Sequence, residues 1–272
     1  MLSDDDLLIV GCGRLGAGVA LARPWRSVLG LRRSPASLPL PLIYGDAAAV
    51  ATYEQPAFDR PFSHILLTAT PGLRGGGPGN RLDQALRLLH HRWPQARMVY
   101  TASTAVYGDA DGAVVDENAA LSSDGRSPQL QEIEAAVKNF AQHVILRVGA
   151  IVGADRRPRR LDQKPLQVSG DPHRPFPFIH QEDLQQVIAY ALWDRRMQGV
   201  WNCVAPLSLD YAAYYRGYLE QEGIDTSNLV IEGDGSQQPN RRIDATRLWQ
   251  HLGPQAWLLP WQPGPSRIRP PI

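Results

Sequence analysis

The sequence predicts an α/β fold, a doubly wound parallel sheet with a small C-terminal lobe. Three observations support it: an apolar run that leads into a glycine-rich turn, short apolar runs that alternate with helical patterns up to residue 148, and a change of composition after about residue 152. Apolar runs without polar alternation are typical of parallel strands buried on both faces, and their alternation with helices builds a doubly wound sheet. The 272 residues, 43% of them hydrophobic, suffice for a substantial core.

The elements follow one another at short intervals. The predicted strands are 7–10, 27–31, 42–44, 64–70, 97–102 and 143–148. The predicted helices are 15–21, an alanine-rich stretch opened by Asp46, 81–93, and 129–140. In the third of these helices, Leu82, Leu86 and Leu89 recur at helical spacing before Pro94 ends the pattern.

The region after Val152 has a different character. It is rich in proline and arginine and then shows two helical patterns, 182–193 and 209–222, and an extended piece, 200–204. We therefore divide the chain into a Rossmann-like domain, 1–152, and a region, 153–272, that is mainly a small C-terminal substrate lobe. Some segments of this second region are candidates to return to the sheet.

The first apolar run ends in the pattern G-x-G-x-x-G, formed by Gly11, Gly13 and Gly16 with Arg14 and Leu15 between the last two. In this pattern the first glycine permits a tight turn, the second lets a pyrophosphate approach the backbone, and the third lets the helix pack close to the strand. The helix N-terminus then offers N–H groups to the phosphates. The pattern predicts a dinucleotide site; the alternative is an ordinary glycine-rich turn.

The end of the second predicted strand indicates which dinucleotide binds. An acidic residue there favours NAD, whereas arginine accommodates the 2′-phosphate of NADP. The chain has Arg32, Arg33 and Ser34 at this place and no acid beside them. We therefore predict NADP, with a solvated loop as the alternative reading.

Three further residues are candidate coenzyme contacts. Asp46 follows the third predicted strand and could bind the adenine amine or cap the helix predicted after it. Ala69 and Thr70 lie at the end of the fourth predicted strand, at the same edge of the sheet.

Composition excludes several classes of function. A formal net charge of +1 gives no broad positive field for nucleic acid or acidic membrane, and no apolar run approaches the roughly 20 residues that span a bilayer. Asp4, Asp5 and Asp6 stand where a secretory signal would be positive, so we expect a cytoplasmic protein. The two cysteines give no disulfide framework and no zinc spacing, and His90 and His91 would point apart on a helix, so no metal is predicted.

Five motifs carry a resemblance to a known family: GCGRLG at 11–16, STAVYGD at 103–109, LRVGAIVG at 146–153, FIHQEDL at 178–184 and WNCVAP at 201–206. In order and spacing they resemble the extended short-chain dehydrogenases/reductases, over nearly the whole chain. The resemblance implies a Rossmann fold and an NAD(P)-dependent epimerase, dehydratase or reductase. The family's usual glycine pattern is G-x-x-G-x-x-G, so this chain looks like an atypical branch.

The chain departs from the family at the active site. Family members use a Ser or Thr after the fifth strand and a Tyr-x-x-x-Lys pair about twenty residues later. No such pair exists here: the positions four before Lys138 and Lys164 are Glu134 and Arg160, and the expected place reads 122-SSDGRSP-128. Without the lysine that lowers the tyrosine pKa from about 10, ordinary alcohol oxidation should be crippled.

Three side chains remain as catalytic candidates. Ser103 matches the family's catalytic hydroxyl, with a strand-end cap as the alternative. Tyr107 could donate a proton or simply pack in the VYG turn, and His180 could replace the missing phenol or be structural. The loop after Val152 contains four arginines, which would bind an anionic substrate or simply be solvated: Arg156, Arg157, Arg159 and Arg160.

Two classes of function follow. The first is an NADP-dependent oxidoreductase or epimerase with a non-standard proton relay. Its substrate would be a small polar molecule, either neutral or anionic. The second is a catalytically silent NADP(H)-binding protein that reports coenzyme state to a partner. We favour the enzyme.

Overall fold

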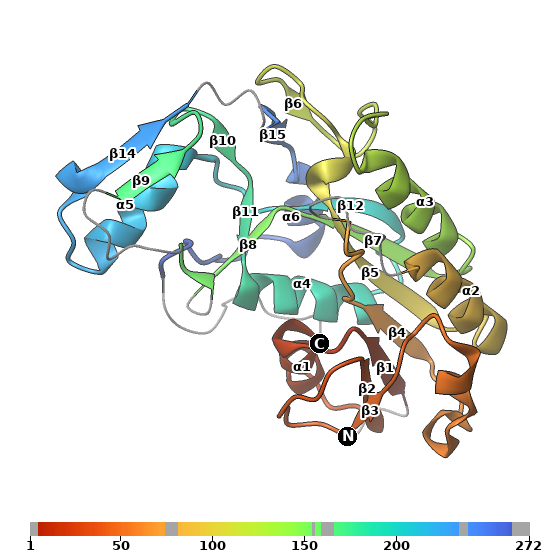
Figure 1. Ribbon diagram of the computed structural model, residues 1–272. Helices are drawn as coiled ribbons and strands as arrows, with labels where there is room; N and C mark the ends of the chain where they lie inside the picture. Colours follow the sequence, from red (N-terminus) through yellow and green to blue (C-terminus); the bar gives the residue numbers. More distant parts are fainter. Residues whose placement is uncertain (1–4, 74–80, 154–155, 159–165, 234–238, 263–272) are drawn as a thin grey trace.

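The computed structural model describes residues 5–73, 81–153, 156–158, 166–233 and 239–262. Figure 1 shows a large α/β body from which a smaller lobe projects. In the described residues, no helix combines the length and the apolar character needed to cross a bilayer.

The body is built on a seven-stranded sheet in the order β12-β7-β5-β4-β1-β2-β3. All six neighbouring pairs are parallel, which confirms the predicted Rossmann-like fold class. The strands are β1 (Asp6–Val10), β2 (Ser27–Arg32), β3 (Leu42–Tyr44), β4 (His64–Leu67), β5 (Arg97–Ser103), β7 (His143–Val148) and β12 (Gly199–Cys203). The strand β12 comes from the region after residue 153 and forms one edge of this sheet.

Helices cover both faces of the sheet. They are α1 (Arg14–Leu21), α2 (Leu82–Arg92), α3 (Ser127–Val137), α4 (Gln181–Trp193) and α6 (Thr246–Leu252). Alternate residues of β1 point to opposite cores: Leu7 and Ile9 pack with residues of α1, α4 and α6, whereas Leu8 and Val10 pack with residues of α2 and α3. This is the period-two pattern of a strand buried on both faces.

The smaller lobe contains α5 (Tyr211–Gln221) and short paired strands. The pairs are β9 (Leu166–Ser169) with β14 (Leu229–Glu232), and β10 (Pro175–Phe176) with β13 (Leu209–Asp210). The pair β8 (Ala150–Val152) and β11 (Phe178–His180) connects the lobe to the body, and β6 (Val114–Val115) pairs with β15 (Arg242–Ile243) above the sheet. A cluster of aromatic residues, including Tyr214 and Tyr218, forms the core of the lobe.

Most predicted elements match to within a few residues at their ends, and the helix predicted over 129–140 is α3, Ser127–Val137; two others differ more. The strand predicted over 64–70 ends at Leu67, because the N–H groups of Thr68 and Ala69 both turn to the carbonyl of Val10. The alanine-rich stretch after Asp46 forms two 3₁₀ turns, Val50–Glu54 and Pro56–Phe58, and no α-helix. Gln55 is extended because it precedes Pro56, and this interrupts the helix.

Candidate functional site

The glycine-rich turn joins the end of β1 to the start of α1. Gly11 has φ +81°, and a Cβ on it would lie 2.4 Å from the backbone of Ala69, so only glycine fits. A Cβ on Gly16 would lie 2.7 Å from the side chain of Ile9, so the helix can pack close to the strand only with glycine there. Gly13 is the N-cap residue of α1, and a Cβ on it would meet only the Gly11 carbonyl oxygen, 4.0 Å away. The space in front of Gly13 is open, as a phosphate at the helix N-terminus requires.

A cavity of about 280 Å³ lies in front of this turn. Its walls come from the carboxyl ends of β1, β2 and β4 and from the segment after β3. The predicted coenzyme residues that line it are Gly11, Gly13, Arg32, Arg33, Ser34, Asp46, Ala69 and Thr70. Arg14, Leu15 and Gly16 lie in the first turn of α1 outside the lining, and the Leu15 side chain is buried in the core. The structure therefore brings eight of the eleven predicted residues to one cavity.

The two arginines after β2 are placed differently. Arg32 lies over the glycine turn, where its Nη1 donates to the carbonyl of Cys12 at 3.0 Å and its Nε donates to the carbonyl of Ser34. Arg33 and Ser34 are exposed at the rim of the cavity. The Cys12 thiol is buried, and this burial raises its pKa to about 11. These residues fit a dinucleotide, because they combine open space over a helix N-terminus with cations at the end of β2.

Asp46 forms a turn at the opposite wall. Its Oδ1 accepts from the N–H of Ala48 at 2.9 Å, and its Oδ2 accepts from Nη2 of Arg81 at 3.0 Å. The bond from Ala48, followed by Arg81, holds the pKa of the carboxyl below its usual value, although partial burial opposes this. Because no α-helix follows, the predicted helix N-cap is in fact the cap of a turn. Asp46 lines the cavity, and its contact with an adenine stays a prediction.

Ser103 ends β5 at the carboxyl edge of the sheet. Its Oγ accepts from the N–H of Ala105 at 3.2 Å, so it caps the short turn that follows. The side chain is half-buried, and its O–H remains able to donate. The capping and catalytic readings of Ser103 are therefore compatible.

Tyr107 lies in a buried polar network. Its hydroxyl donates to Oδ1 of Asn202 at 2.7 Å and accepts from Nη1 of Arg147 at 2.9 Å. Arg147 in turn makes a two-bond ion pair with Glu134, at 3.0 and 2.8 Å, and both side chains are 3% exposed. Burial raises the pKa of Tyr107. A phenol held in this way supports the packing interpretation of Tyr107.

His180 joins β11 to α4 and is 3% exposed. Its Nδ1 accepts from the N–H of Glu182 at 3.2 Å and so caps α4, while its buried Nε2 has no hydrogen-bond partner in the described structure. A Cβ on Gly153 would lie 3.1 Å from this Nε2. Burial lowers the pKa of His180, with a smaller opposing effect from the backbone of Gln262. The imidazole is therefore neutral near pH 7 and serves as a helix cap.

No family model matches the sequence. The Protein YeeZ of Escherichia coli K12 is 27% identical over 195 residues, which are 69% of each chain. A functionally unknown conserved protein from Silicibacter pomeroyi has a TM-score of 0.75 at 24% identity and covers 93% of each chain. The dTDP-glucose 4,6-dehydratase DesIV from Streptomyces venezuelae, solved with NAD and TYD bound, has a TM-score of 0.74 at 16% identity, covering 98% of this chain and 92% of DesIV.

Other structures with this fold are a dTDP-glucose 4,6-dehydratase from Bacillus anthracis in complex with NAD and a putative NAD-dependent epimerase/dehydratase from Methylobacillus flagellatus. The chain shares the fold of these NAD-dependent epimerase/dehydratase-like proteins. Four of the motifs that carry the resemblance cover the carboxyl ends of β1, β5, β7 and β12 or the residues that follow them, and FIHQEDL forms β11 and the start of α4.

The place that the resemblance gives for the Tyr-x-x-x-Lys pair, 122–128, lies in the loop before α3 and in its first two residues, and it contains no tyrosine or lysine. Arg126, within this segment, is the N-cap residue of α3. A guanidinium stays protonated and cannot exchange a proton near neutral pH. The start of α3 therefore offers a fixed positive charge at this place instead of a proton donor.

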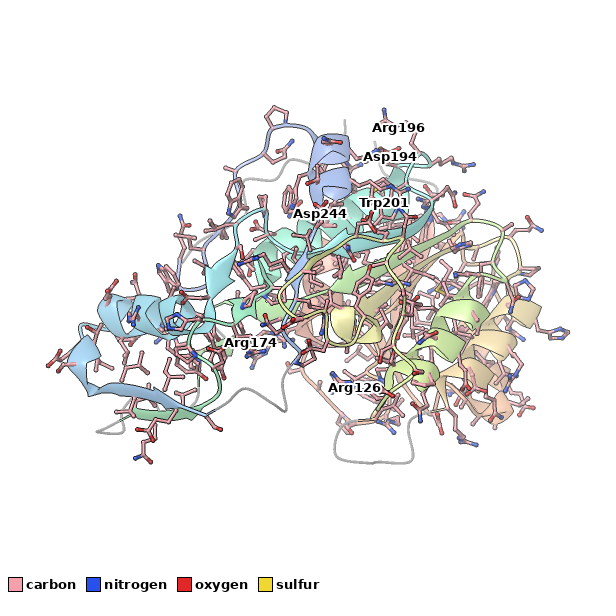
Figure 2. All side chains as sticks on the ribbon, turned by 90° about the horizontal axis from the view of Figure 1, so that it is seen from above. Arg126, Arg174, Asp194, Arg196, Trp201 and Asp244 are labelled. Carbon is pink, nitrogen blue, oxygen red and sulfur yellow. The ribbon has the colours of Figure 1, made fainter. Side chains whose placement is uncertain are left out.

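Two further arginines add to this positive charge. Arg241 is 6% exposed, donates through Nη1 to the carbonyl of Gly108 and through Nη2 to that of Thr104 at 2.9 Å, and has a buried Nε without a partner. Arg174 also has a buried, unpartnered Nε, and its Cζ lies 4.6 Å from the centre of the Tyr211 ring. Burial lowers the pKa of Arg241, and the charges of Arg174 and Arg126 lower it further, although Asp109 opposes them. We call Arg126, Arg174 and Arg241 the arginine cluster; Figure 2 labels the first two.

The sequence did not reveal this cluster, because its members come from three distant segments. The arginine group that the sequence did suggest is placed elsewhere. Arg156 Nε donates to Oε1 of Gln181 at 3.0 Å, and Arg157 pairs with Glu222 at 2.6 Å. Arg159 and Arg160 lie outside the described residues.

Proposed function

We propose that this chain binds NADP(H) beside its glycine-rich turn and acts as an oxidoreductase or epimerase-like enzyme with a non-standard active site. The observation that carries the proposal is the cavity in front of Gly13, with Arg32, Arg33 and Ser34 at the end of β2. The NAD reported in DesIV supports a nicotinamide dinucleotide for this fold. The arginines support the phosphorylated form.

The roles of the residues follow from their geometry. The open N-terminus of α1 would hold the pyrophosphate, because the N–H groups of its first turn point toward the space over Gly13. Arg33, exposed at the rim, would pair with the 2′-phosphate, while Arg32 keeps the turn in place through Cys12. Bound NADPH would supply a hydride. Ser103 would donate its O–H to the substrate carbonyl and so orient it.

The arginine cluster supports an anionic substrate. Arg241 lies against the loop that follows Ser103, through the carbonyls of Thr104 and Gly108. A buried guanidinium whose Nε lacks a partner retains N–H capacity for a carboxylate or phosphate. We therefore extend the proposal to a small substrate that carries such a group.

A second candidate function is a silent NADP(H)-binding protein. The segment 122–128 favours it, because it contains neither the tyrosine nor the lysine that moves protons in hydride-transferring members of the family that the chain resembles. The buried, neutral His180 favours it as well, since its Nδ1 already caps α4.

The test is calorimetric titration of the purified chain with NADPH and NADH. We expect saturable binding that is at least tenfold tighter for NADPH, and Arg33→Ala should remove this preference without affecting NADH. Arg87→Ala, an exposed arginine on α2, is the matched control and should bind like the native chain. Equal affinities for both coenzymes would contradict the NADP preference, and no saturable binding would overturn the proposal.

The coenzyme-loaded chain then decides between enzyme and silent protein. Oxidation of NADPH is followed at 340 nm with a panel of aldehydes and ketones, half of which carry a carboxylate or phosphate. Turnover with the anionic members, lost in Ser103→Ala, supports the enzyme. Tight NADPH binding with no turnover of any member supports the silent protein.

A further inference from the structure

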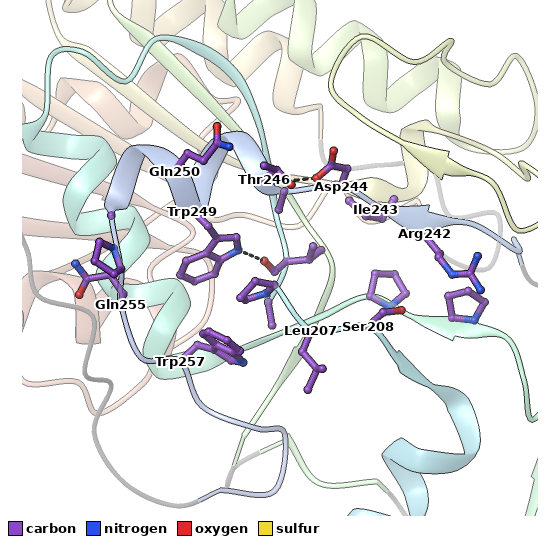
Figure 3. Close-up of a pocket in the computed structure, with 18 residues that line it drawn as sticks. Leu207, Ser208, Arg242, Ile243, Asp244, Thr246, Trp249, Gln250, Gln255 and Trp257 are labelled. Atoms are coloured by element: carbon purple, nitrogen blue, oxygen red, sulfur yellow. Dashed lines mark hydrogen bonds between the residues drawn. The ribbon is translucent and has the colours of Figure 1, made fainter.

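A second cavity lies apart from the coenzyme cavity and has a volume of about 590 Å³. Figure 3 shows this cavity, whose lining comes from the loop that follows β12, the segment from β15 through α6, Pro175 of β10 and Pro177 just after β10. It shares no lining residue with the coenzyme cavity, and Ser103, His180 and the arginine cluster do not line it. Its volume falls within the range of small-molecule sites.

Two indole rings form one side of this cavity. Trp249 donates through Nε1 to the carbonyl of Val204 at 2.8 Å, which fixes its ring, and Trp257 lies 6.3 Å away, between ring centres, at an angle of 51°. Leu207 and Trp257 both line the cavity (Figure 3). Trp257 is 37% exposed and Leu207 is 38% exposed, values that are high for large apolar side chains.

Four prolines also line the cavity. Pro175, Pro177, Pro206 and Pro254 contribute ring carbons and no N–H donors. The lining contains one cation, Arg242, and one anion, Asp244, and both are engaged by the chain. Arg242 Nη1 donates to the carbonyl of Gly112 at 3.2 Å, and Asp244 Oδ1 accepts from the N–H of Thr246 at 2.8 Å.

We propose that this cavity is a second ligand site, which takes a flat, uncharged aromatic or heteroaromatic molecule. Aromatic rings favour offset-stacked and edge-to-face contact with other rings, and the two indoles that line this cavity offer such contacts to a planar guest. The balanced charges of the lining give no net attraction for an ion. The site is independent of the proposed coenzyme function, since its test needs no coenzyme.

The test uses N-phenyl-1-naphthylamine, an uncharged fused-ring dye whose fluorescence rises in apolar surroundings. We expect one saturable site on the native chain. Leu207→Asp, which places a charge at the cavity, should weaken binding at least tenfold. Leu21→Asp is the matched control, because Leu21 is 67% exposed on α1, and it should bind the dye as the native chain does.

A second variant tests the same cavity in case Leu207→Asp does not fold. Trp257→Ala removes one indole and should also weaken binding at least tenfold, with a far-ultraviolet circular dichroism melt that matches the native chain. Absence of saturable binding, or binding that both cavity variants leave unchanged, would overturn the proposal. Displacement of the dye by NADPH would also overturn it, because the dye would then occupy the coenzyme cavity.

Discussion

Gly11 and Gly13 lie in the same turn, but a side chain is excluded there for different reasons, and variants can measure the difference. Gly13→Ala places its methyl group in open space at an N-cap with φ −127°, which alanine adopts without strain. Its free energy of unfolding should change by no more than about 1 kcal/mol. Because the methyl group lies where a phosphate would approach, the affinity for NADPH should fall at least tenfold.

Gly11→Ala is the matched comparison. The left-handed φ of +81° and the backbone of Ala69 at 2.4 Å oppose any Cβ, so this variant should lose stability as well as coenzyme binding. Urea unfolding and calorimetry on both variants check the pair. If Gly13→Ala bound NADPH as tightly as the native chain, the phosphate would not lie over this turn.

The buried pair of Glu134 and Arg147 predicts a large loss of stability from a small chemical change. Glu134→Gln keeps the shape of the side chain but leaves the Arg147 charge uncompensated at 3% exposure. We expect the free energy of unfolding to fall by about 3 kcal/mol. Glu132→Gln, an exposed neighbour on α3, should change it by less than about 0.5 kcal/mol in the same urea titration. Equal losses for the two variants would contradict a structural role for the pair.

Among the helices and strands, the sequence predicted best those that are marked by a pattern of neighbouring residues. The strands 42–44 and 143–148 match the structure residue for residue, because apolar runs bounded by polar or turn residues suffice to define them. No helix forms in the alanine-rich stretch after Asp46, because the backbone is extended at Ala49 and again at Gln55, which precedes Pro56; helix propensity is a weak signal beside such breaks. Helix 209–222 begins two residues late, since Leu209 and Asp210 pair with β10 and Asp210 then caps α5.

Asp194, just after α4, holds α6 against the body. Its carboxylate accepts from Arg196 at 2.8 Å and lies 3.0 Å from Nε2 of His251 on α6, whose ring packs on Trp201. The bonds from Arg196 chiefly, and then His251, lower the pKa of Asp194 well below its usual value, although burial opposes them. Because the folded pKa is lowered, this carboxylate stabilises the chain above about pH 4, the unfolded pKa, and the contribution is lost as pH falls below it.

Asp194→Asn should therefore make the stability of the chain less dependent on pH in the acid range. We expect it to lose about 1 to 3 kcal/mol of unfolding free energy at pH 7 and less at pH 3. Urea unfolding at several pH values between 3 and 7 measures this. Asp83→Asn, an exposed acid on α2, is the control. A loss that is the same at pH 3 and pH 7 would show that the charge of Asp194 does not matter.

At the scale of the whole molecule, the sheet order explains which site residues the sequence could find. The strands β1, β2 and β4 are neighbours, so residues that follow each of them gather at one cavity, and a short motif in each strand end was enough to predict it. The arginine cluster gathers only through long-range folding: Arg126 precedes α3, Arg174 precedes β10 and Arg241 precedes β15. No local pattern marks those three residues.

Coenzyme binding should also stabilise the whole fold, because the cavity joins the glycine turn to residues of β2 and β4 that unfolding would separate. A ligand that binds only the folded state at 100 times its dissociation constant contributes about 2.7 kcal/mol. For a chain of this size that corresponds to a rise of roughly 5 °C or more in Tm. We expect this rise with NADPH, a smaller one with NADH at equal concentration, and at most about half of it in Gly13→Ala, because a tenfold weaker affinity leaves about 1.4 kcal/mol. Scanning calorimetry measures all three, and a rise that Gly13→Ala retains in full would place the coenzyme away from the turn.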